Sequence, residues 1–153
     1  MTKATQTTKN IIIDCWTSLR SMPGWVQVWM MLILVPVNAI SLAFIGEDMG
    51  LWIAFLANIG VLPNLPILIV NRGFSNAMAL AHIVPWTILI AIILFDRPDA
   101  AGAYDTYLWA LLIVNGISLA FDYPDALKWF KGDRAVAGRY FTQLDLAKSC
   151  SSR

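Results

Sequence analysis

The sequence contains few charged residues: Asp, Glu, Lys and Arg together make up 14% of its 153 residues. Soluble domains carry about 25% charged residues, so this composition excludes an ordinary soluble enzyme. Disordered chains have low hydrophobicity, whereas 58% of the residues here are hydrophobic and the mean hydropathy is +0.63. The composition therefore predicts an integral membrane protein.

Side chains that bind metals or perform catalysis are also scarce. The chain has two cysteines, Cys15 and Cys150, and a single histidine, His82. A zinc site needs three or four such ligands close together, so we expect no metal and no cofactor. The sequence has no GxSxG, HExxH, Walker A or GxGxxG motif, which favours a non-enzymatic protein. A net charge of +1 gives no field that would attract nucleic acid, so we expect no nucleic-acid partner.

Four long stretches contain no charged residue. The first has 26 residues, the next two have 23 each and the last has 16. A helix that crosses a bilayer needs about 20 apolar residues. The sequence therefore predicts four transmembrane helices, at about 25–45, 51–70, 77–95 and 104–121. Because the turns between them are short, the expected fold is all-α: a polytopic membrane protein whose four helices form an antiparallel bundle.

The basic residues are distributed unevenly among the segments that precede, connect and follow the predicted spans. Ten of the eleven Lys and Arg residues precede the first span, separate spans two and three, or follow span four, and only Arg97 lies on the other side. Basic segments stay cytoplasmic, so both termini are expected in the cytoplasm, with the protein in the inner (plasma) membrane of a bacterium. The lipid bilayer is then an obligatory partner.

The two flanking segments predict short amphipathic helices at the membrane surface. The expected organisation is a cytoplasmic amphipathic segment (1–24), a transmembrane domain (25–121) and a cytoplasmic basic segment (122–153). In the last segment Asp122 would cap a new helix with Pro124 in its first turn. The apolar and basic residues that alternate after Pro124 suit a helix on the inner membrane surface, and a solvated tail is the alternative.

An eight-residue motif occurs twice, at 37–44 and 114–121, with seven identical positions. Each copy has two small residues four apart, and the third span has such a pair as well. Small residues at this spacing let helices approach closely in lipid. The candidate helix-packing residues are Ala39, Ala43, Ala77, Ala81, Gly116 and Ala120.

Uncharged polar residues within the spans form a candidate set for ligand binding or for packing: Asn38, Asn58, Asn64, His82, Asn115 and Ser118. A helix rises about 1.5 Å per residue, which places Asn38 and Asn58 in the outer half and Asn64, His82 and Asn115 in the inner half. We expect Asn38 to pair with Asn58, and pairs to form within the inner group. Asn38 and Asn115 should not meet, because this arithmetic separates them by about 8 Å in depth.

Two prolines interrupt the second span near Asn64. Pro63 and Pro66 each remove a helical hydrogen-bond donor, so they should kink or break this span. Broken helices in membranes can line a ligand site, although a simple packing kink is the preferred interpretation.

Three functions fit these patterns. The first is an accessory, scaffold or assembly subunit of a membrane complex that acts through helix–helix packing, as a homo-oligomer or within a larger assembly. The alternative is a small oligomeric channel or transporter with a polar path near Asn64, His82 and Asn115. The third and weakest is a lipid-modifying enzyme that uses Asp122 and Asp125, since helix capping explains both carboxylates.

Overall fold

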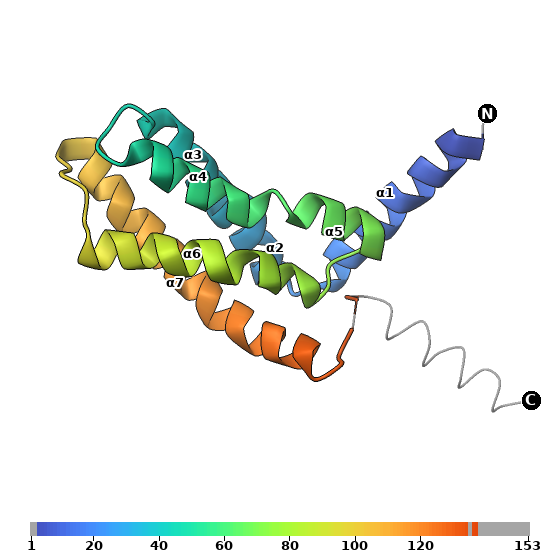
Figure 1. The fold of residues 1–153 in the computed structure, drawn as a ribbon. Helices are drawn as coiled ribbons and strands as arrows, with labels where there is room; N and C mark the ends of the chain where they lie inside the picture. The colour runs from blue at the N-terminus through green and yellow to red at the C-terminus, as the bar shows by residue number, and fades with distance from the viewer. Residues whose placement is uncertain (1–2, 135, 138–153) are drawn as a thin grey trace, which may run out of the picture.

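The computed structural model describes residues 3–134 and 136–137 (Figure 1). Every named element in this part of the chain is helical, and its one β-type contact is an isolated bridge between Ser75 and Val136. In chain order the elements are α1 (Lys3–Ser21), α2 (Gly24–Val28), a π-helix (Trp29–Leu34), α3 (Val35–Ile40), a 3-10 helix (Ser41–Phe44), α4 (Gly50–Val61), α5 (Asn64–Asn71), α6 (Ala77–Phe95) and α7 (Gly102–Phe130).

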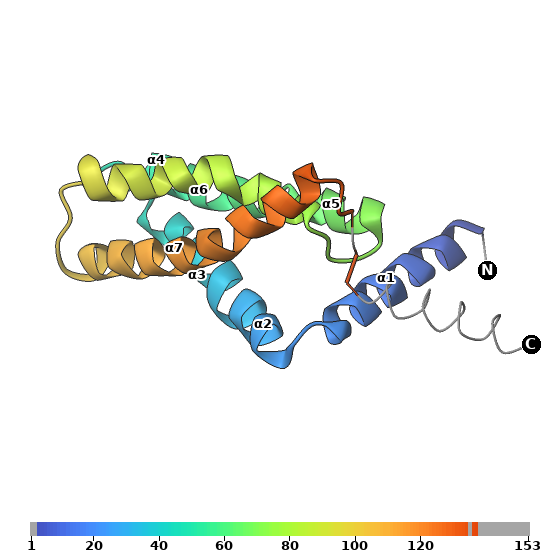
Figure 2. The same cartoon turned by 90° about the horizontal axis from the view of Figure 1, so that it is seen from below.

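Four helical stretches are long and apolar enough to cross a membrane, at Gly24–Phe44, Gly50–Asn71, Ala77–Phe95 and Gly102–Phe130. The prediction of an all-helical chain with four such spans is confirmed. Helix α1 precedes these spans and projects away from them (Figure 2).

The first span changes helix type three times. A π-helical stretch follows α2, and the span ends in a 3-10 helix after α3. Pro36 lies two residues beyond the π-helix and has no N–H to donate, so the regular α-helical bonding pattern cannot be complete there. The span is therefore irregular where its polar residues are placed.

The second span is broken where the sequence predicted an interruption. Helix α4 ends at Val61 and α5 begins at Asn64, with Pro63 immediately before it and Pro66 in its first turn. The break turns the chain so that Asn64 is buried at the start of a new helix.

Helix α7 is longer than the sequence indicated. It continues for 29 residues through Asp122 and Pro124 to Phe130, so the expected helix start at Asp122 is wrong. Proline removes only one helical donor, and the face that α7 buries continues to Ala126, so packing maintains the helix across Pro124. The segment expected as a separate surface helix is the last two turns of α7.

Helix α6 lies against both α4 and α7 and provides the middle of the core (Figures 1 and 2). The largest fully buried apolar side chains come from these three helices: Ile53, Trp86, Leu89, Ile93, Leu108 and Leu111. Gly60 lets α4 approach α6 closely, because a Cβ atom at this position would lie 2.2 Å from Nε1 of Trp86. The core is therefore centred on α6.

Three segments far apart in the sequence meet at one end of the molecule. Ser18 Oγ of α1 donates to the carbonyl of Ala137 (2.9 Å) and accepts from the N–H of Phe74 (2.9 Å). The N–H of Ala137 donates in turn to the carbonyl of Phe74 (2.8 Å). We call these three residues the Ser18 junction. It joins α1, the turn after α5 and the chain after α7, which are the three segments that carry most of the basic residues.

Candidate functional site

The polar side chains within the spans form two separate clusters. The first connects the irregular first span with α4 and α7, and the second connects α5 with α6 and α7. Each residue of the predicted polar set lies in one of them.

The first cluster is built on a reciprocal pair of amides. Asn38 Nδ2 donates to Asn115 Oδ1 (2.9 Å), and Asn115 Nδ2 donates to Asn38 Oδ1 (3.2 Å). Both side chains are completely buried. The expectation that these two residues would not meet is wrong. It placed the middle of the fourth span near residue 112, whereas the midpoint of α7 is at Gly116 because the helix continues to Phe130.

The rest of the first cluster satisfies its polar atoms through neighbouring helices. Asn58 Nδ2 donates to Ser41 Oγ (2.9 Å) and, at 3.4 Å, to the carbonyl of Asn38, so the expected contact between Asn38 and Asn58 exists through backbone. Trp29 Nε1 donates to Ser118 Oγ (3.2 Å). Such bonds contribute only about 0.6 kcal/mol each in bilayers, so this cluster fixes the positions of the helices more than it stabilises them.

The second cluster contains the only histidine. Asn64 Nδ2 lies 2.5 Å from His82 Nε2, and His82 Nδ1 lies 3.0 Å from Asp122 Oδ2. The side chains of His82 and Asp122 are 12% and 16% exposed. The ring of His82 stacks on Trp86 with 4.0 Å between centroids and 5° between planes. A carboxylate, an imidazole and an amide thus form one nearly buried row beside the break between α4 and α5.

One tautomer of His82 satisfies both of its contacts. Its Nδ1–H donates to the Asp122 carboxylate, while Nε2 accepts from the amide of Asn64. Oδ1 of Asn64 is then buried without a hydrogen-bond partner among the residues that the structure describes. An unsatisfied buried acceptor lowers stability by about 1–3 kcal/mol. Oδ1 of Asn64 is therefore the atom of this cluster that could still accept a hydrogen bond.

Asp122 is the site residue that sequence reasoning missed. We expected it to cap a helix, but its carboxylate bonds to His82 across two helices. The sequence holds a signal for this placement: Asn115, Ser118 and Asp122 are spaced by three and four residues, so they share one face of a continuous helix. Asn115, which was expected near His82, belongs to the first cluster.

The predicted small residues lie mainly on the outside. Ala39, Ala43 and Ala120 are exposed, and Ala77, Ala81 and Gly116 are half-buried. A Cβ atom on Gly116 would meet only Ile90 Cδ1, at 4.0 Å. Within one copy of the chain, these small residues therefore do not lie at close contacts between helices.

The fold defines the class of this protein: an integral membrane protein with four apolar helices of spanning length. Comparison with known protein families, curated proteins and solved structures found no match to this chain. Among the described residues, no group of three His, Cys, Asp or Glu side chains could hold a metal ion. The carboxylates considered for an enzyme each have a partner, since Asp125 bonds to Lys128 (2.7 Å) and Asp122 to His82.

Proposed function

We propose that this protein is a non-enzymatic membrane protein that acts through helix–helix contacts, as an accessory, scaffold or assembly subunit of a membrane complex. In this proposal the four spans form an antiparallel bundle in a bacterial inner membrane, with both termini cytoplasmic. The assembly is either a homo-oligomer or a larger complex.

One observation carries the proposal: in both copies of the repeated motif the polar residues are buried and the small residues lie at or near the surface. The Asn and Ser of each copy point inward and are at most 5% exposed, namely Asn38, Ser41, Asn115 and Ser118. The small residues of the same copies lie at or near the surface. These Asn and Ser side chains already have partners inside the molecule, so the outward small residues are available to a helix of another chain. Close approach of backbones favours association in lipid, where the hydrophobic effect between helices is missing.

The proposal is tested by enlarging the outward face of the first span. Ala39→Leu and Ala43→Leu should reduce the mass of the assembly purified in mild detergent, measured by size-exclusion chromatography with light scattering. Val84→Leu, an enlargement at an exposed position of α6, is the control and should leave the mass unchanged. If the wild-type protein is monomeric and carries no partner, the proposal fails.

A second candidate is a small oligomeric channel or transporter, and the second cluster favours it. Asp122 beside His82, with the open acceptor of Asn64, provides ionisable groups within the spans, which often mark ion or substrate paths. After Cys15→Ser and Cys150→Ser, a water-soluble thiol reagent should label Asn64→Cys and Asp122→Cys rapidly if this path is wet. Asn115→Cys is the dry control, because its side chain is completely buried. Slow labelling at all three positions would exclude the path.

A further inference from the structure

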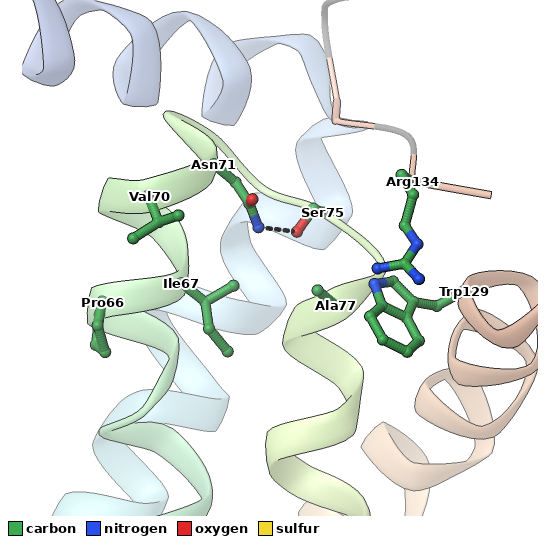
Figure 3. A pocket seen from close by; sticks show the side chains of 8 residues that line it. All are labelled: Pro66, Ile67, Val70, Asn71, Ser75, Ala77, Trp129 and Arg134. Atoms are coloured by element: carbon green, nitrogen blue, oxygen red, sulfur yellow. Dashed lines mark hydrogen bonds between the residues drawn. The ribbon is translucent and has the colours of Figure 1, made fainter. Parts of the chain in front are cut away.

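A cleft of about 360 Å³ opens at the end of the molecule that holds the Ser18 junction (Figure 3). Pro66, Ile67 and Val70 of α5 form one wall, and Ala77 of α6 and the ring of Trp129 form the other. Ligand sites typically enclose about 300–1,000 Å³, so the cleft is large enough for part of a small molecule. Its walls are apolar and belong to three different helices.

The mouth of this cleft carries a cation. The guanidinium carbon of Arg134 lies 3.7 Å from the centroid of the Trp129 ring, which holds the group over the cleft (Figure 3). No carboxylate lines the cleft, and none of the described residues forms an ion pair with Arg134. The other polar lining residues, Asn71 and Ser75, bond to each other at 2.8 Å. The guanidinium therefore offers its donors to a ligand.

A second arginine, near the start of α7, has a similar position relative to a tryptophan ring but a different partner. Arg97 also lies over a tryptophan, with its guanidinium carbon 4.5 Å from the ring centroid of Trp109. However, its guanidinium pairs with the carboxylate of Asp105. Both guanidinium groups thus lie over a tryptophan ring, but among the described residues only Arg97 has a carboxylate partner.

We propose that this cleft binds an anionic phospholipid, with the phosphate at Arg134 and the upper part of one acyl chain along Pro66, Ile67 and Val70. The guanidinium of Arg134 favours an anionic group at the mouth of the cleft, and the apolar walls favour a hydrocarbon chain next to that group. A free inorganic anion would meet only the first requirement. Val70 is 80% exposed, so the wall formed by α5 is open to the hydrocarbon side of the interface. This inference is independent of the function proposed above.

The test uses the fluorescence of Trp129 and lipids with brominated acyl chains, which quench tryptophan on contact. The protein is placed in phosphatidylcholine vesicles that contain brominated phosphatidylglycerol or brominated phosphatidylcholine at equal mole fraction. We expect a preference of about fivefold for the anionic lipid, the effect of one basic residue at a membrane surface. Trp129→Phe should remove the excess quenching by phosphatidylglycerol, because it removes the reporter.

Charge variants separate the cleft from general attraction to the membrane. Arg134→Gln should abolish the excess quenching, Arg134→Lys should retain part of it, and Arg97→Gln should leave it unchanged. Circular dichroism of each variant checks that its helices are intact. Equal quenching by both lipids in the wild-type protein would overturn the proposal, as would excess quenching that persists in Trp129→Phe. Loss of the excess on adding inorganic phosphate would show a site for free phosphate and would also overturn it.

Discussion

Gly60 is the residue that allows α4 to lie directly against α6. Trp86, its neighbour, is completely buried and is fixed on two sides, by a bond from Nε1 to the carbonyl of Ala57 (3.2 Å) and by the stacked ring of His82. An added methyl group at Gly60 would lie 2.2 Å from the indole nitrogen of this completely buried side chain, so the ring or a helix would have to shift. Gly60 therefore lies at a tight contact between two helices, whereas Gly116 of the repeated motif does not.

We predict that Gly60→Ala lowers the free energy of unfolding in detergent by about 1–3 kcal/mol, the usual cost of overpacking a filled core. Gly116→Ala is the matched control, since its new Cβ would meet only the end of Ile90 at 4.0 Å. Alanine is a better helix former than glycine, so Gly116→Ala should be neutral or slightly stabilising. Equal losses in the two variants would contradict the close contact between Gly60 and Trp86.

A second prediction concerns the hydrogen bonds of His82. Asp122→Leu removes the acceptor at Nδ1, so the proton should move to Nε2, and the amide of Asn64 should turn its oxygen toward the ring. Because the chain has one histidine, ¹⁵N-labelled histidine gives a single pair of ring signals whose shifts identify the tautomer. Asp125→Leu removes an exposed carboxylate that bonds to Lys128, and it should leave both signals in place. An unchanged tautomer in Asp122→Leu would disprove the bond.

At the scale of elements, the Asn38–Asn115 pair connects the irregular first span to α7. Single replacements by Leu leave one buried amide without its partner, whereas the double replacement removes both amides. A double-mutant cycle in detergent should therefore show a favourable coupling of about 0.6 kcal/mol and not above about 1.7 kcal/mol. Asn115→Leu combined with Asn64→Leu, which lies in the other cluster, should be additive.

The positions of the four spans could be predicted because each contains a long stretch without charged residues, and the interruption at Pro63 followed from the missing proline donor. The continuation of α7 could not be predicted in the same way. Asp122 followed by Pro124 is typical of a helix start, and only the packing of α7 against α6 decides that the helix continues. That one error moved the expected depth of Asn115 and hid the contact between Asp122 and His82.

For the whole molecule, the distribution of charge predicts the orientation in the membrane. A reporter fused after Arg153 should be cytoplasmic, and one inserted at Glu47 should be external, because ten of eleven basic residues belong to segments on one side. The contacts agree with this grouping, since the Ser18 junction joins the basic segments at one end while Asp99 N–H donates to Asp48 Oδ2 (2.9 Å) at the other. A C-terminal reporter on the outside would require an odd number of crossings.

The Ser18 junction also has a consequence for the order of assembly. Ser18 and Ala137 are 119 residues apart, so α1 leaves the ribosome long before its partner is made. Contacts of such separation form late, because the loop between them must first be ordered. We expect α1 to be held only by its contacts with α5 and the turn after it until the residues that follow α7 have been made. Protease cleavage near Ser21 should then be rapid in chains that are truncated before residue 136 and slow once the junction has formed.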